Sequence, residues 1–218
     1  MQIINFSAKK SLLNIFVREI RDVEIQKDRL RFRRNLERIG EVMAYEISRE
    51  LNYEQCEVET PLGRLPAGAI SDSVVLGTIL RAGLAFHHGF LNYFDRAGNA
   101  FVSAYRKYDE IHRDFDIHIE YIASPSLEGK TLILTDPMLA TGGSMELAYK
   151  ALLTRGCPKQ VHIASIVASE PAIAYCKMHF PAETTTLWTA AIDPEINESS
   201  YIVPGLGDAG DLAYGEKE

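Results

Sequence analysis

Short strand-like segments that alternate with helix-like segments constrain the fold of this chain more than any other feature. Segments rich in β-branched and aromatic residues, bounded by turn or helix signals, fall at residues 73–80, 99–105, 117–123, 130–136, 160–168 and 185–192. Between them, residues 82–94 and 144–156 repeat apolar side chains at helical spacing. Strands that alternate with helices predict an α/β fold, with an open, mostly parallel sheet flanked by helices. The second and third segments are close enough in sequence to form an antiparallel hairpin, or β-arm, instead.

The N-terminal region has a different pattern. Residues 10–51 place apolar side chains three or four positions apart, which predicts helices. Residues 51–68 contain two prolines and two glycines, which is typical of a hairpin-like or loop insertion. Because no repeat, low-complexity tract or linker divides the sequence, we expect a single domain over residues 1–218. Within it, residues 1–72 would supply the helices and the insertion, and residues 73–211 the functional site.

The composition favours a soluble, cytoplasmic protein. Apolar residues make up 46% of the chain, enough for a continuous core. We find no secretory signal and no run of about 18 apolar residues, so we expect no membrane span. Cys56, Cys157 and Cys176 show neither metal-binding nor disulfide spacing, and we expect reduced thiols.

The net charge argues against nucleic acid as a partner. The chain has 23 basic and 30 acidic residues, a formal charge of −7. An acidic surface repels polyphosphate chains, so nucleic-acid binding would require a local basic patch. Basic residues are dense only at Arg29, Arg31, Arg33, Arg34 and Arg38. Their spacing predicts the solvated face of an amphipathic helix, and we expect no nucleic-acid partner.

The segment after the strand-like residues 130–136 has the composition of an anion-binding loop. It reads DPMLATGGS, from Asp136 to Ser144. Its Thr-Gly-Gly-Ser end would leave several backbone amides unpaired at the start of the next predicted helix. Glycines let amides approach an anion closely and the helix dipole adds positive potential, so the loop fits a phosphate monoester. The alternative is an ordinary joint between strand and helix, with Ser144 as the N-cap.

Two further stretches have the composition of binding loops. ILRAG, residues 79–83, can place the guanidinium of Arg81 and free amides against a diphosphate. The alternative there is an Arg81 paired with a surface carboxylate. YIVPGLGDAGD, residues 201–211, has three glycines and one proline, which fix an irregular backbone rather than a helix or strand. Such a backbone can read a planar base with its own N–H and C=O groups, and the alternative is a flexible tail.

These three stretches, in the order in which they follow one another along the chain, resemble the motifs of the uracil phosphoribosyltransferases. DPMLATGGS is close to the form that the motif for phosphoribosyl pyrophosphate (PRPP) takes in this family. LRAG resembles the family's pyrophosphate loop, and YIVPGLGDAGD resembles its uracil-binding segment. The resemblance implies a type I phosphoribosyltransferase fold. It also implies transfer of the phosphoribosyl group of PRPP to N1 of uracil, which gives UMP and pyrophosphate in pyrimidine salvage.

The resemblance also implies the roles of individual residues. Asp136 would hold the ribose, Ala140 to Ser144 would cradle the 5-phosphate, and two arginines would reach the diphosphate. Asp136, Arg81 and Arg106 are the residues it assigns to catalysis. Mg²⁺ would be carried by PRPP without a direct protein ligand and would reach Asp208 through a bound water. The PRPP-binding set is Arg81, Arg106, Asp136, Pro137, Met138, Leu139, Ala140, Thr141, Gly142, Gly143, Ser144 and Asp208, and the uracil-binding set is Ile202, Gly207, Asp208 and Ala209.

The chain departs from the family pattern in two places. Many members have two adjacent acids at the strand end, whereas here Asp136 is followed by Pro137, which excludes general-base catalysis by a second acid. After Arg106 the family usually has a short YR-N-E-E-T run, and this chain reads YRKYDE, with Asp109 and Glu110 as the nearest acids.

The resemblance and the sequence also indicate partners of this chain and leave two other functions open. Relatives are dimers or larger, and the apolar faces of the predicted N-terminal helices favour a homodimer or higher homo-oligomer. Some relatives respond to GTP, which makes GTP a candidate effector. One alternative is a catalytically silent PRPP- or UMP-binding regulator, which would need a basic face for RNA. Another is a phosphoribosyltransferase for a different base.

Overall fold

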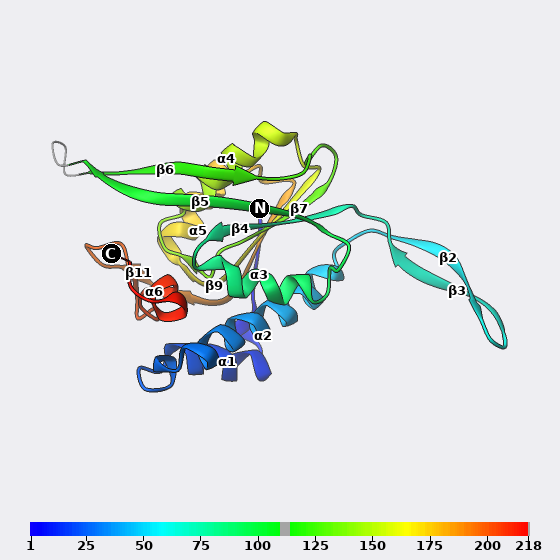
Figure 1. Cartoon of the computed structure of the whole chain (residues 1–218), viewed down its shortest axis with the longest axis horizontal. Coiled ribbons are helices and arrows are strands. Elements are labelled where there is room, and N and C mark those ends of the chain that lie inside the picture. The colour runs from blue at the N-terminus through cyan, green and yellow to red at the C-terminus, as the bar shows by residue number, and fades with distance from the viewer. Residues whose placement is uncertain (110–113, 218) are drawn as a thin grey trace.

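A mixed β-sheet forms the centre of the molecule (Figure 1). The computed structural model describes the backbone of residues 1–109 and 114–217 and the side chains of residues 1–103 and 120–217. Within this part, eight strands form one sheet in the order β1-β10-β9-β7-β4-β5-β6, with β8 beside β9. Its strands are β1 (Gln2–Asn5), β4 (Val74–Leu80), β5 (Gly98–Asp109), β6 (Asp114–Ala123), β7 (Thr131–Thr135), β8 (Met138–Leu139), β9 (Gln160–Ser169) and β10 (Thr185–Asp193).

The pairing of the strands confirms the predicted α/β architecture. β5 and β6 pair antiparallel, as the hairpin prediction required, and the other described pairs of this sheet run parallel. Two strands were not predicted. β1 at the N-terminus pairs with β10, and β8 is a two-residue strand inside the stretch predicted as a loop. Both are too short to give a periodic signal.

Two hydrophobic clusters lie on opposite faces of the sheet. Successive strand residues point to opposite faces, so Leu76 and Ile133 join one cluster while Val75 and Leu132 join the other. Because both faces are covered, the central strands are continuous apolar runs rather than alternating ones. The first face carries α1 (Leu12–Arg21), α2 (Arg29–Ser48) and α3 (Gly83–Leu91), and the second carries α4 (Gly143–Leu152) and α5 (Glu170–His179) (Figure 1).

The N-terminal helices pack inside the chain's own core. Residues 10–51 were predicted as helix, and the structure has two helices separated by a turn of 3-10 helix, Ile25–Lys27. α2 begins after Asp28, whose side chain accepts hydrogen bonds from the backbone of Leu30 and Arg31. The buried apolar side chains of both helices, among them Leu13, Ile20 and Leu36, pack into the core on this face of the sheet, whereas Leu12, Ile15 and Leu30 are exposed. This packing takes up part of the apolar surface on which the prediction of a homo-oligomer rested, and the oligomeric state stays a prediction.

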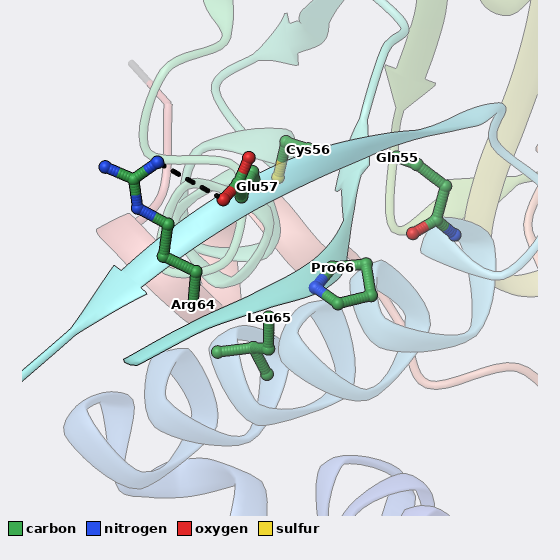
Figure 2. Close-up of a pocket in the computed structure, with 6 residues that line it drawn as sticks. All are labelled: Gln55, Cys56, Glu57, Arg64, Leu65 and Pro66. Atoms are coloured by element: carbon green, nitrogen blue, oxygen red, sulfur yellow. Dashed lines mark ion pairs between the residues drawn. The ribbon is translucent and has the colours of Figure 1, made fainter. Parts of the chain in front are cut away.

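A long hairpin projects from the body of the molecule (Figure 1). It is formed by β2 (Tyr53–Thr60) and β3 (Gly63–Ile70), which pair antiparallel and confirm the predicted insertion. Nearly all of its residues are exposed, and Leu62 at the tip is fully so. Figure 2 shows an open pocket on this arm, lined by Gln55, Cys56, Glu57, Arg64, Leu65 and Pro66.

The C-terminal stretch differs in part from its prediction. β11 (Glu195–Ile196) pairs with β12 (Ile202–Val203), which lies inside the stretch predicted to be irregular, and residues 204–208 are irregular, as expected. The chain then forms α6 (Ala209–Tyr214), where an irregular backbone was predicted. The Asp208 side chain caps this helix by accepting from Asp211 N at 3.0 Å. Among the described residues, no helix is long and apolar enough to cross a membrane.

Candidate functional site

The three sequence stretches meet in one cleft at the carboxyl ends of β4 and β7. Ligands of open α/β sheets bind at this edge. The cleft has a volume of about 520 Å³, within the usual range for small-ligand sites. It is lined by Ile79, Leu80, Arg81, Ala82, Asp136, Met138, Ala140, Ser144, Ser200, Tyr201, Ile202, Gly207, Asp208, Ala209, Gly210 and Lys217.

The loop between β7 and α4 is held by its first residues. Asp136 follows β7 directly, and the carbonyl oxygen of Pro137 accepts from Ile166 N at 3.1 Å and Val167 N at 3.0 Å. Gly142 is the N-cap of α4 with φ of +87°, a left-handed conformation that favours glycine. Ser144 lies inside the first turn of α4 and is therefore not the N-cap that the alternative required. The amides at the start of α4 therefore lie beside the cleft.

Arg81 is paired with a carboxylate and also lines the cleft. Its Nη2 donates to Asp211 Oδ1 at 3.0 Å and to the carbonyl oxygen of Gly215 at 3.1 Å. Among the described residues, its buried Nε has no hydrogen-bond partner. The carboxylate pairing that the alternative required is therefore present, and Arg81 also lines the cleft, so its contact with a diphosphate stays a prediction. Two residues on, Gly83 starts α3, and a Cβ there would collide with Thr78 Oγ1.

Two residues that the sequence did not indicate hold the loop between β12 and α6 by hydrogen bonds to its backbone. Asp193, at the end of β10, accepts from Gly205 N at 2.9 Å. Arg21 donates to the carbonyl oxygen of Gly205 at 3.1 Å and forms an ion pair with Asp193 at 2.8 Å. Neither residue belongs to a local motif, so only the folded chain brings them to this loop.

The structure brings together most, but not all, of the predicted site residues. Arg81, Asp136, Met138, Ala140, Ser144, Ile202, Gly207, Asp208 and Ala209 line the cleft. Pro137, Leu139, Thr141, Gly142 and Gly143 lie in the same loop and helix start but do not line it. Arg106 lies in β5, opposite Ile117, and its side chain is outside the described residues, as is Glu110. Seven other residues line the cleft: Ile79, Leu80, Ala82, Tyr201 and Gly210 lie in the two stretches predicted as binding loops but had no assigned role, and Ser200 and Lys217 were not predicted.

The carboxylates of the cleft fit a metal that arrives with a ligand. Within the described part of the chain, no group of three or more His, Cys, Asp or Glu side chains is placed to hold a metal ion. Asp136 and Asp208 nevertheless line the same cleft as Arg81. Mg²⁺ commonly uses one or two protein carboxylates together with substrate phosphates and waters. The donor set therefore fits a magnesium ion carried on a diphosphate.

A helix-flanked parallel sheet with these loops at its carboxyl edge defines a type I phosphoribosyltransferase fold. The structure of the AQ2163 protein from Aquifex aeolicus is similar over 98% of each chain, with a TM-score of 0.86 and 28% identity. A hypoxanthine phosphoribosyltransferase from Staphylococcus aureus shares the fold alone, with a TM-score of 0.50 and 12% identity over 75% of this chain and 76% of its own.

Sequence comparison narrows the class to one family. The family model described as "Uracil phosphoribosyltransferase" matches residues 7–216. The chain is 66% identical to a uracil phosphoribosyltransferase of Porphyromonas gingivalis over the full length of both. It is 36% identical to one of Sulfolobus acidocaldarius over 94% of this chain and 97% of the relative. The chain belongs to the uracil phosphoribosyltransferase family.

Proposed function

We propose that this chain is the enzyme that transfers the phosphoribosyl group of PRPP to N1 of uracil, giving UMP and pyrophosphate. The observation that carries the proposal is the single cleft shared by Arg81, Asp136 and residues 202–209 in a chain of this family. A cation, a carboxylate and a rigid backbone loop are the groups that a diphosphate, a ribose and a pyrimidine require.

PRPP would lie between β4 and α4. The 5-phosphate would bind the amides of residues 140–144, where the positive end of the α4 dipole adds to the attraction. Asp136, at the end of β7, would accept hydrogen bonds from the ribose hydroxyls. Arg81 would contact the diphosphate, joined by Arg106 from β5.

Uracil would lie against the loop between β12 and α6. Uracil presents O2 and O4 as acceptors and N3–H as a donor, so backbone groups alone can read it. Ile202, Gly207, Asp208 and Ala209 would make these contacts. The ion pair of Arg21 and Asp193 supports this assignment, because it fixes the loop at Gly205.

The chemistry that these groups support is substitution at C1 of the ribose. N1 of uracil forms its bond to C1 as the bond from C1 to the diphosphate oxygen breaks, through an oxocarbenium-like state, and the N1 proton passes to solvent or to the departing diphosphate. The residues act by positioning and by stabilising charge rather than by covalent catalysis. Asp136 holds the ribose, the 140–144 turn holds the phosphate, and Arg81 stabilises the departing diphosphate. No side chain is assigned as an essential general base.

Mg²⁺ is the proposed cofactor. When bound to PRPP it would neutralise part of the diphosphate charge. Asp208 would hold it through a water molecule, with no direct protein ligand. Asp208 also caps α6, which fixes its carboxylate at the rim of the cleft.

We further propose a homodimer or higher homo-oligomer. The projecting arm supports this proposal, since an isolated two-stranded hairpin is marginal in water and this one exposes Val58, Leu62 and Leu65. GTP as an effector, a cytoplasmic location and one domain over residues 1–218 stay predictions.

The alternative, a catalytically silent PRPP- or UMP-binding regulator, would need a basic face for RNA, and the arginines of α2 are largely occupied by contacts within the chain. Arg31 pairs with Glu19 at 2.7 Å, Arg34 pairs with Glu37 at 2.6 Å, and Arg33 donates to the carbonyl oxygen of Ala213 at 2.7 Å. Arginines engaged in this way offer a weak face for RNA.

Conversion of labelled uracil with PRPP and Mg²⁺ tests the proposed function, with and without GTP. Cytosine and hypoxanthine are the control bases. UMP formation from uracil alone is the expected result. A protein that makes no nucleotide, while PRPP or UMP raises its Tm, would be the silent regulator instead. Conversion of a control base in place of uracil would reassign the substrate.

A further inference from the structure

Tyr175, in α5, lies against the loop that begins α4. A Cβ added at Gly142 would lie 2.7 Å from Cδ1 of Tyr175 and 3.3 Å from its Cγ. The tyrosine ring therefore occupies the space that any side chain at residue 142 would need. Tyr175 does not line the cleft itself. Its influence on a bound ligand would pass through the loop.

The hydroxyl of Tyr175 fixes the ring in this place. It donates to Glu146 Oε2 at 2.5 Å, and Glu146 lies in the first turn of α4. The backbone N–H of Glu146 donates to the carbonyl oxygen of Gly142 at 3.0 Å, which closes the same turn. The ring of Tyr175 thus lies against Gly142 at one end of this turn, and its hydroxyl binds Glu146 at the other.

The pKa values of Glu146 and Tyr175 keep the carboxylate charged and the phenol neutral. Burial alone would raise the pKa of the Glu146 carboxyl, but hydrogen bonds from Lys150 and Tyr175 and the nearby His179 outweigh it and lower the pKa. The hydrogen bond to Glu146, with burial, raises the pKa of Tyr175 to about 12. At neutral pH the phenol is therefore a neutral donor to a carboxylate, a strong type of hydrogen bond.

A second contact ties α5 to the start of the same loop. Ser169, the buried N-cap of α5, donates from Oγ to the carbonyl oxygen of Ala140 at 2.6 Å. Its Oγ also accepts from Ala172 N at 3.0 Å, which caps the helix. α5 therefore contacts the loop at Ala140 and, through Tyr175, at Gly142.

We propose that Tyr175 is a positioning residue for the 5-phosphate of PRPP. Its ring holds the turn at Gly142 in the conformation that presents amides to the phosphate. The inference rests on the proposed function and deepens the same site. Preorganised donors bind without a cost of ordering, and a loop without its support must be ordered by the ligand. Loss of the ring therefore weakens PRPP binding, while uracil binding at the other loop stays unchanged.

Three variants separate this role from a general effect on folding. Tyr175→Leu removes the ring, Tyr175→Phe keeps it without the hydroxyl, and Tyr149→Leu is the control. Tyr149 stacks on Phe180 with ring centroids 4.9 Å apart, in the core between the same helices. The measurements are the Kd of PRPP with Mg²⁺ by calorimetry without uracil, the KM of each substrate, and Tm.

We expect Tyr175→Leu to raise the Kd and the KM of PRPP roughly tenfold and to leave the KM of uracil within about twofold. Tyr175→Phe should stay within about threefold of wild type for PRPP, because the ring remains. Tyr149→Leu should lower Tm without weakening PRPP binding.

Wild-type PRPP affinity in Tyr175→Leu, or equal weakening in Tyr149→Leu, would overturn the inference. If Tyr175→Leu does not fold, Tyr175→Met, which also removes the ring, decides. A rise in the PRPP Kd alone supports the role, and no rise, or equal rises in both KM values, contradicts it. Failure of the inference is distinct from failure of the function, since wild type would then still form UMP. If the wild-type protein neither binds PRPP nor forms UMP, the proposed function itself is wrong.

Discussion

Arg21 in the last turn of α1 and Asp193 at the end of β10 form a two-pronged ion pair directly under the loop proposed to bind uracil. Nη1 lies 2.8 Å from Oδ2, and Nη2 lies 3.0 Å from Oδ1. The same pair holds both backbone groups of Gly205. Asp193 is buried, so this is a desolvated, well-oriented pair of the kind that fixes geometry.

Asp193→Asn should therefore loosen base binding more than PRPP binding. An amide cannot complete the fork with Arg21, and the anchor of Gly205 weakens. We expect the KM of uracil to rise about fivefold and that of PRPP to change less than about twofold. Glu24→Gln, which removes an exposed ion pair with Lys27, is the control and should change neither. Equal rises in both KM values would show that Asp193 acts on the whole fold.

Arg81→Lys should impair turnover with PRPP. Arg81 holds Asp211 and the carbonyl oxygen of Gly215 from one nitrogen, and its planar fork can also meet a diphosphate. A lysine offers a single point charge and cannot serve both. We expect kcat/KM for PRPP to fall at least about tenfold at unchanged Tm. Steady-state kinetics with thermal unfolding checks this, and full activity in Arg81→Lys would remove Arg81 from the diphosphate site.

Gly142→Ala should damage the phosphate loop beyond its cost in backbone strain. Gly129→Ala is the matched control, because Gly129 also has positive φ, +66°, but a Cβ there would meet no atom of the described residues within 4 Å. Each substitution should cost about 1–2 kcal/mol of unfolding free energy for the left-handed backbone. Only Gly142→Ala also collides with Tyr175, so only it should weaken PRPP binding. Urea unfolding and PRPP titration of both variants test this difference. Equal PRPP affinity in the two variants would contradict the assignment of the Gly142 turn to phosphate binding.

Asp72 should stabilise the fold in a pH-dependent manner. Burial would raise the pKa of its carboxyl, but hydrogen bonds from Asn52 and Lys159 outweigh it and hold the pKa below the ordinary value. The stabilisation is then present above the ordinary aspartate pKa and is lost as the pH falls through the lower folded-state value. Asp72→Asn should cost about 2 kcal/mol at pH 7.

Urea unfolding at pH 7 and at about pH 3 tests this linkage. The difference between wild type and Asp72→Asn should shrink at the lower pH. Asp95→Asn, at an exposed aspartate, serves as the control and should have little effect at either pH. A difference of the same size at both pH values would contradict the role of the Asp72 charge.

The regular elements could be predicted because their patterns are local. β7 is a continuous apolar run since both of its faces are covered, and α2 carries a clear apolar stripe. The family and the α/β fold were confirmed for the same reason, since each motif is contiguous. α6 was missed because the glycines of GLGDAGD suggested irregular backbone throughout, whereas Asp208 caps a short helix there.

The supports of the site could not be predicted, because they join residues that are distant in sequence. Arg21 and Asp193 are 172 residues apart, and Arg81 and Asp211 are 130 apart. Tyr175 reaches the phosphate loop from another helix and looks in the sequence like any helical aromatic residue. Contiguous motifs indicate which residues could contact a ligand. Only the folded structure shows which distant residues keep those motifs in position.

Parallel quantification of UMP and pyrophosphate, by wild type and by Asp136→Asn, tests the central proposal most directly. Wild type should form the two products in equal amounts from uracil and PRPP with Mg²⁺. Asp136→Asn should keep its Tm and lose at least about tenfold in kcat/KM, because an amide cannot replace a carboxylate that accepts from two hydroxyls. No UMP from wild type, or full activity in a well-folded Asp136→Asn, would contradict the proposal.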